Sequence, residues 1–169
     1  MRRLAIALAL LAALCSAAPA AGTGGVRWRP YADALKEAGR AKKLVMVVLH
    51  AKWCAPCRVM ARTTWVDPAV VALANRAVVP VEFDLDADAE PIRCGPETLP
   101  PSACASLYWR TPGLPAFVLV DHEGEFVHQE MGLFGPELMK SFLEEVEKET
   151  PEILRELRAW KDSVARASK

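Results

Sequence analysis

Short apolar runs alternate with amphipathic segments along the chain, and this alternation predicts an α/β fold. The run at 44–49 is rich in β-branched residues and predicts a buried strand. The runs at 78–85 and 116–120 predict two more strands. A fourth strand at 125–129 should pair back on the third as a hairpin, through a turn at 121–124. With 169 residues, the chain is long enough for one domain with a sizeable core.

Helices are predicted between and after these strands, where apolar residues recur at helical spacing. The expected helices cover 30–39, 54–62, 68–76, 102–108, 136–149 and 151–166. Asp67 and Pro68 form a start signal, because aspartate caps helices and proline suits the first helical position. Thr150 and Pro151 form a similar signal, which should separate the last two helices.

Residues 87–101 are rich in proline and have the composition of a loop. A long loop costs little closure entropy, but it must be pinned to be ordered. A disulfide between Cys94 and Cys104 would pin this segment.

Residues 1–21 have the features of a secretory signal peptide. Two arginines at the start are followed by an uncharged Ala/Leu run at 4–14 and by small residues at 18–20, where cleavage is expected. The apolar run is too short to span a bilayer comfortably, and a retained signal anchor is the alternative. Cleavage would leave a single domain at 22–169.

The charge balance argues against a nucleic-acid partner. The formal net charge of the whole chain is zero, and its hydrophobic content of 52% is raised by the N-terminal segment. Loss of Arg2 and Arg3 lowers the basic count from 21 to 19, against 21 acidic residues. Nucleic-acid-binding domains carry a basic excess, which this chain lacks. No membrane span is expected after signal cleavage.

Cleavage also removes Cys15 and leaves four cysteines, an even number that suits an oxidising compartment. Three pairings are possible, and the local spacing favours Cys54–Cys57 and Cys94–Cys104. We therefore expect an exported protein, periplasmic or secreted, with Cys94–Cys104 as a structural disulfide.

The segment Trp53-Cys54-Ala55-Pro56-Cys57 lies where the first strand ends and a helix begins. A thiol at a helix N-terminus faces unpaired backbone N–H groups and the positive end of the helix dipole. Both favour the nucleophilic thiolate, so Cys54 is the expected attacking residue. Cys57, one turn further in, is expected to be more buried and to resolve a mixed disulfide.

An inert disulfide and half of a zinc site are the alternatives for this motif. Structural bridges seldom close so tight a loop at a strand-to-helix junction. A zinc site usually takes two close cysteine pairs, whereas nine residues of Pro-rich sequence separate Cys94 from Cys104.

With this motif and this order of elements, residues 26–149 resemble the thioredoxin superfamily, and within it the exported proteins of the DsbD C-terminal-domain type. The resemblance rests on the Trp-Cys-x-x-Cys motif and on the segments 63–70, 113–115 and 132–135. It implies a thioredoxin fold, in which helices flank a central mixed sheet. Residues 87–101 would be an insertion before the cis-proline strand, and 151–166 an extra C-terminal helix.

The resemblance also implies how substrate is bound. Pro115 would be a cis-proline that faces the dithiol, and Leu114 would present backbone groups to a bound peptide beside Cys54. Trp53 would contribute to the same surface. An ordinary trans-proline at the start of a strand is the alternative for Pro115.

The chain departs from this family at Val48, where its members usually carry a buried acid that takes the proton of the resolving thiol. Glu82, on the neighbouring strand, is the candidate replacement, because burial would make its carboxylate a stronger proton acceptor. A solvent-exposed Glu82 is the alternative, since charged residues are seldom buried. His50 lies close to the motif and is a second candidate for a redox role.

These features favour an exported thiol–disulfide oxidoreductase, whose Cys54–Cys57 pair exchanges with protein or peptide thiols and disulfides. The resemblance favours a reductase or thiol relay over an oxidase and implies a redox partner that recharges the dithiol. No cofactor or metal is expected. One alternative is a peptide-binding or folding module with little turnover. Another is a metal-binding relative, but His122 and His128 do not match the pattern of copper-handling members.

Overall fold

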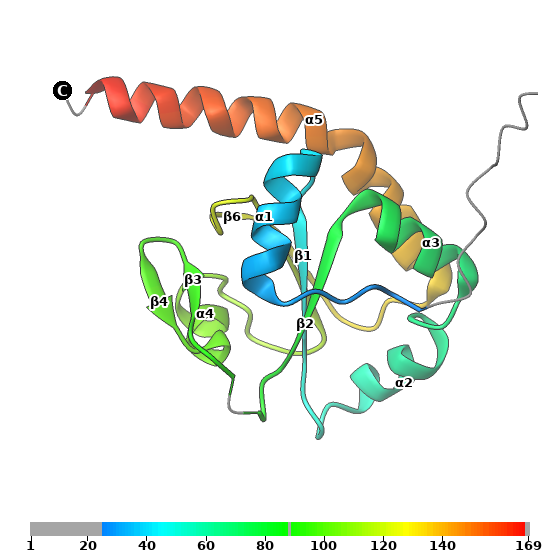
Figure 1. Ribbon diagram of the computed structural model, residues 1–169. Coiled ribbons are helices and arrows are strands. Elements are labelled where there is room, and N and C mark those ends of the chain that lie inside the picture. The colour runs from blue at the N-terminus through cyan, green and yellow to red at the C-terminus, as the bar shows by residue number, and fades with distance from the viewer. Residues whose placement is uncertain (1–24, 88, 168–169) are drawn as a thin grey trace, which may run out of the picture.

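The structure is a computed structural model that describes residues 25–87 and 89–167. Its centre is a four-stranded sheet in the order β2-β1-β5-β6 (Figure 1). The strands are β1 (Val45–His50), β2 (Val79–Asp84), β5 (Ala116–Val120) and β6 (Phe126–Met131). β1 is parallel to β2 and antiparallel to β5, which is antiparallel to β6. The mixed sheet is as predicted, whereas the predicted signal peptide, 1–21, lies outside the described residues.

Helices cover both faces of this sheet (Figure 1). They are α1 (Tyr31–Ala41), α2 (Ala55–Thr63), α3 (Pro68–Ala77), α4 (Pro101–Leu107) and α5 (Pro136–Ala167). The start signal before α3 is confirmed, because the Asp67 side chain accepts hydrogen bonds from the backbone N–H groups of Ala69 and Val70.

The alternating directions of β1 side chains build two separate cores. Val45, Val47 and Leu49 pack with buried residues of α1 and α4 on one face of the sheet. Met46 and Val48 pack on the other face with buried residues of α2, α3 and α5. Because both faces are covered, every side chain of β1 up to Leu49 is buried, which explains the unbroken apolar run.

The segment predicted to be an irregular loop contains a small hairpin, so that prediction was wrong in part. Strands β3 (Ile92–Cys94) and β4 (Glu97–Leu99) pair antiparallel across a tight turn. Gly95 allows the turn, since its φ of +61° is disfavoured for residues with a Cβ. The strands are three residues long, which is too short for periodicity to reveal them.

The two helices expected at the C-terminus are one continuous helix, α5, with Pro151 inside it. Pro151 removes one backbone hydrogen bond and should bend the helix rather than end it here. Figure 1 shows α5 changing direction midway and then projecting from the body. The apolar stripe continues with the same helical spacing past the proline, at Ile153 and Leu157, so packing carries the helix through.

An ion pair ties the projecting half of α5 to the turn between β5 and β6. Lys161 donates to the buried carboxylate of Asp121 and to Glu123. Asp121 also accepts the backbone N–H groups of Glu123 and Glu125, so it organises the turn itself. The last part of the helix is therefore anchored although most of its residues are exposed.

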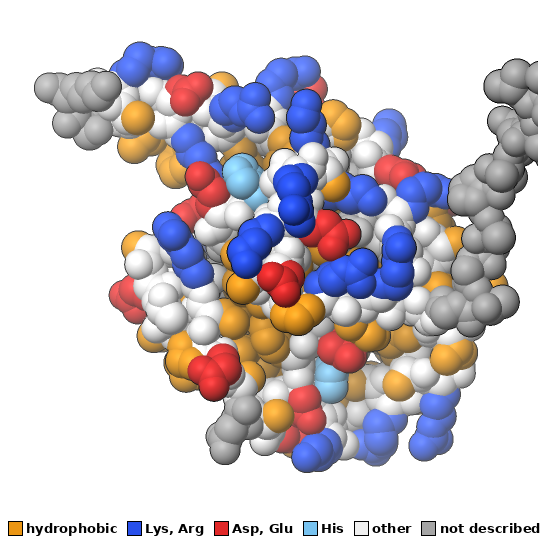
Figure 2. All heavy atoms as spheres, viewed as in Figure 1, with side chains coloured by type: hydrophobic (Ala, Val, Ile, Leu, Met, Phe, Trp, Pro, Cys, Tyr) orange, Lys and Arg blue, Asp and Glu red, His pale blue; other side chains and the backbone are white. Residues whose placement is uncertain are grey.

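Charged side chains of both signs are interspersed over the face in Figure 2, including the projecting part of α5. In the described part of the chain, no helix is both long enough and apolar enough to cross a membrane.

Candidate active site

Cys54 occupies the N-cap of α2, directly after the turn that follows β1. Its backbone N–H donates to the carbonyl of Ala51 at 3.1 Å, and its sulfur accepts the N–H of Cys57 at 3.1 Å. Pro56 lies in the first turn of the helix, where its missing N–H costs nothing. Cys54 and Cys57 form a disulfide, as their spacing predicted. In the reduced state the same N–H would stabilise a Cys54 thiolate.

The expected difference in burial between the two cysteines is not found. Cys54 is 2% exposed and Cys57 is 9% exposed, so the sulfur expected to attack is not the more accessible one. Leu114 packs over the small cluster of Ala51, Cys54 and Cys57, which explains the burial of Cys54. Cys54 differs from Cys57 in its position at the N-cap of α2, not in its exposure.

A carboxylate that was not predicted from the sequence braces the turn before Cys54. Asp86 accepts the backbone N–H of Lys52 at 2.7 Å and the indole N–H of Trp53 at 3.1 Å. Arg58 closes the turn from the other side by donating to the Lys52 carbonyl at 2.7 Å. Trp53 is thereby held in place although it is 69% exposed.

The Leu114–Pro115 peptide bond is cis, as the resemblance implied. Pro115 is buried at the start of β5, and Leu114 is partly buried against the cysteine cluster. Leu114 therefore adjoins the dithiol, and Trp53 directly precedes Cys54 in the chain.

A cavity of about 360 Å³ adjoins the second cysteine. Its apolar wall includes Val48, Cys57, Trp65 and Pro115. The wall also carries polar side chains, namely His50, Lys52, Arg58, Glu82 and Asp84. Cys57 therefore shares this cavity with several titratable side chains.

Glu82 lines this cavity, but it is not buried. Its side chain is 47% exposed, so the burial on which its predicted role rested is not found. His50 lies beside it, with Nε2 of His50 3.8 Å from Oε2 of Glu82. Glu82 thus lines the same cavity as Cys57 but is in contact with water.

The second disulfide and the remaining histidines lie apart from this site. Cys94, at the end of β3, and Cys104, in α4, form the predicted bridge, and both are fully buried. His122 is exposed, and His128 pairs with Glu130 at 2.9 Å. Within residues 25–87 and 89–167, no three His, Cys, Asp or Glu side chains are grouped so that they could hold a metal ion.

Proteins that hold a redox-active cysteine pair at this helix N-terminus exchange thiols and disulfides, and this chain is a thiol–disulfide oxidoreductase in that broad sense. A thioredoxin-like family model matches residues 27–122, more than half of the sequence. The chain therefore belongs to the thioredoxin-like family, which confirms the predicted superfamily and fold. No curated protein matches it significantly.

Solved structures with a similar fold include redox proteins. A DsbH oxidoreductase is 19% identical with a TM-score of 0.58, over 80% of this chain and 92% of that one. A thioredoxin from Thermus thermophilus is 27% identical with a TM-score of 0.51, over 73% of this chain and 85% of that one. The oxidised C-terminal domain of DsbD from Neisseria meningitidis is 21% identical with a TM-score of 0.49, over 69% of this chain and 90% of that one.

Proposed function

We propose that the protein is an exported reductase or thiol relay that acts on protein or peptide disulfides through Cys54 and Cys57. The observation that carries the proposal is the hydrogen bond from the Cys57 backbone N–H to the Cys54 sulfur at the N-cap of α2. This arrangement favours negative charge on Cys54, which is what nucleophilic attack on a disulfide requires.

The reaction transfers two electrons from the dithiol to the substrate. The Cys54 thiolate attacks one substrate sulfur, forms a mixed disulfide and releases the other sulfur as a thiolate. Cys57 then loses its proton and attacks the Cys54 sulfur, which frees the second substrate sulfur and closes the Cys54–Cys57 disulfide. The released thiolates take up protons. A partner with a more reducing dithiol must then recharge the pair.

Substrate would lie across Trp53, Leu114 and Pro115. Trp53 offers a large exposed aromatic surface that is fixed by its bond to Asp86. The cis bond before Pro115 leaves the backbone of Leu114 beside the cysteine cluster, where it can pair with an extended peptide. We propose Glu82 as the proton acceptor for Cys57, acting through the cavity that both residues line.

The composition of residues 1–21 supports export to the periplasm or beyond, with 22–169 as the mature domain. An oxidising compartment also suits the buried Cys94–Cys104 bridge, for which we propose a structural role. The direction of electron flow depends on the potential of the active pair relative to its partners. We propose reduction or relay because of the resemblance to DsbD-type domains.

The alternative is a peptide-binding or folding module with little turnover, which the exposed Trp53 would also suit. Reduction of insulin disulfides with dithiothreitol as electron donor separates the two. The mature protein should accelerate insulin precipitation, and Cys54→Ser should abolish the effect. A Cys54→Ser variant with full activity would refute the proposed chemistry. A wild-type protein that binds unfolded insulin chains without reducing them would establish the alternative.

A further inference from the structure

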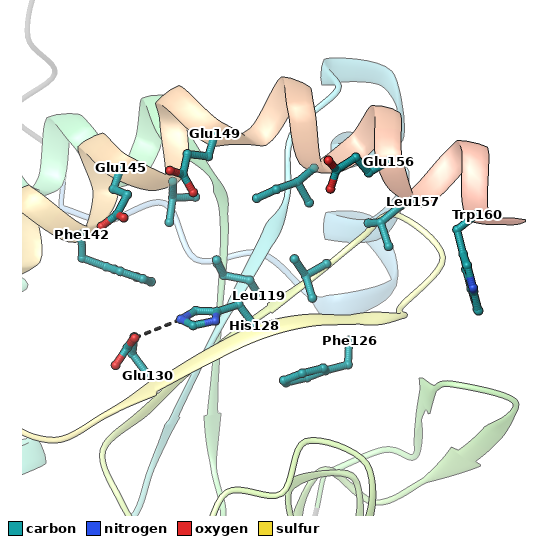
Figure 3. Close-up of a pocket in the computed structure, with 13 residues that line it drawn as sticks. Leu119, Phe126, His128, Glu130, Phe142, Glu145, Glu149, Glu156, Leu157 and Trp160 are labelled. Atoms are coloured by element: carbon teal, nitrogen blue, oxygen red, sulfur yellow. Dashed lines mark hydrogen bonds and ion pairs between the residues drawn. The ribbon is translucent and has the colours of Figure 1, made fainter.

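A groove of about 580 Å³ lies between α5 and the strands at one edge of the sheet (Figure 3). None of the residues that line this α5–β6 groove lines the cavity beside Cys57. Its lining residues are Leu119, Phe126, Val127, His128, Glu130, Phe142, Glu145, Val146, Glu149, Ile153, Glu156, Leu157 and Trp160.

The inner surface of the groove is apolar. Leu119 comes from the sheet, while Phe142, Ile153 and Leu157 come from α5 and follow its buried stripe outward. At the outer end, Trp160 is 60% exposed, an unusual position for so large an apolar side chain. The groove thus offers hydrophobic contact area that the chain itself does not fill.

The charged side chains that line the groove are glutamates, with no Lys or Arg among the lining residues. In Figure 3, Glu145, Glu149 and Glu156 project from α5 on the side of the groove. They are exposed and have no ion-pair partner in the described part of the chain. Three other glutamates of α5 are paired: Glu137 with Lys140, Glu147 with Arg76 and Glu152 with Arg155.

The three glutamates lie close to one side of the helix, since Glu149 is one turn beyond Glu145 and Glu156 is two turns further. They span roughly 16 Å along the helix axis, at 1.5 Å per residue. An occupant that places cationic groups along this length and apolar groups beneath them would complement both properties of the groove.

We propose that the α5–β6 groove docks a cationic, amphipathic segment of a partner protein, with Lys or Arg against the three glutamates and aliphatic or aromatic side chains inside. Helical segments of this kind bind hydrophobic grooves through their apolar face. Because the groove is separate from the dithiol, docking is independent of disulfide exchange. A client held there stays attached to the protein between successive exchange steps, which raises its effective concentration.

The test is fluorescence anisotropy of labelled peptides with the disulfide-intact protein. One peptide carries Leu and Lys at amphipathic helical spacing, a second replaces Lys by Glu, and a third replaces Leu by Ser. Only the Leu/Lys peptide should bind. The triple variant Glu145→Gln, Glu149→Gln, Glu156→Gln should weaken binding about tenfold, as three exposed charge contacts allow. Trp160→Ser should weaken it through lost apolar contact.

A second triple variant controls for general electrostatic attraction. Glu137→Gln, Glu144→Gln and Glu152→Gln remove the same charge from the same helix, outside the groove. Equal weakening in both triple variants, or in neither, would overturn the proposal. A concentration-dependent dimer in sedimentation, lost in Trp160→Ser, would assign the groove to a second copy instead.

Insulin reduction, measured on the same variants, distinguishes a failure of this proposal from a failure of the proposed function. The groove variants should reduce insulin like the wild type, and the Cys54→Ser variant should still bind the Leu/Lys peptide. A protein that binds the Leu/Lys peptide but does not reduce insulin would therefore refute only the proposed function. A protein that reduces insulin but does not bind the peptide would refute only the proposed docking in the groove.

Discussion

Val48 and Glu82 stand directly opposite each other in the parallel pairing of β1 with β2. Paired positions of neighbouring strands point to the same face of a sheet, so both side chains reach the cavity beside Cys57. The titratable side chain, that of Glu82, thus lies one strand away from the buried position that Val48 occupies. That displacement leaves it in contact with solvent, where water can compete as proton acceptor.

Glu82→Gln is predicted to slow the resolution of a mixed disulfide by roughly tenfold, at the low end of general-base effects because Glu82 is exposed. The first attack by Cys54 should change little. Rapid-quench analysis of a mixed disulfide with a labelled peptide separates the two steps. Glu90→Gln, an exposed carboxylate that does not line the cavity, is the control. Unchanged resolution in Glu82→Gln would leave water as the acceptor.

The sequence was informative wherever a signal is local in the chain. The apolar run before the Cys-x-x-Cys motif, the Asp67 cap and the glycine and proline before β5 each act within a few residues, and each was correctly interpreted. Asp86 was missed because its partner Trp53 is 33 positions away. Pro151 was misinterpreted because a local breaker signal was outweighed by packing of the apolar stripe along α5.

The brace formed by Asp86 gives a second prediction. Asp86→Asn keeps the shape but weakens the hydrogen bonds to Trp53 and to the Lys52 backbone, because they lose their charge assistance. KM for insulin should rise about three- to tenfold, as expected for one or two such bonds. The rate with a small disulfide such as oxidised glutathione should stay within about twofold, since it needs little of the Trp53 surface. An equal loss with both substrates would instead mean that Asp86 positions Cys54.

Removal of the second disulfide gives a third prediction. Cys94 and Cys104 are ten positions apart and fully buried, so Cys94→Ala with Cys104→Ala should cost about 2–3 kcal/mol of unfolding free energy. The melting temperature should fall by roughly 5–10 °C for a chain of this size. Insulin reduction at 25 °C should persist. Mass spectrometry of partly reduced wild-type protein should find that the Cys54–Cys57 disulfide opens first. If the folded double variant lost turnover, electrons would instead pass between the two disulfides in an internal relay.

The anchor between Lys161 and Asp121 gives a prediction on pH. Partial burial alone would lower the pKa of Lys161, but its hydrogen bonds to Asp121 and Glu123 outweigh this effect, and the pKa is raised. A raised lysine pKa means that the folded state holds the proton more tightly than the unfolded state. The stabilisation is therefore complete below the unfolded pKa of about 10.5 and is lost as pH rises through the folded value.

Lys161→Met should lower the free energy of unfolding by about 1.5–3 kcal/mol at pH 7, because it leaves the buried carboxylate of Asp121 without its cation. Urea unfolding of the variant and the wild type should be compared from pH 7 to above pH 11. The difference in their free energies of unfolding should stay constant up to about pH 10 and shrink above it, because Lys161 of the wild type then loses its proton. Lys140→Met is the control on the same helix, since its partner Glu137 is almost fully exposed and should contribute under about 1 kcal/mol. A deficit that does not shrink at high pH would mean that Lys161 acts through packing of its aliphatic stem rather than through its charge.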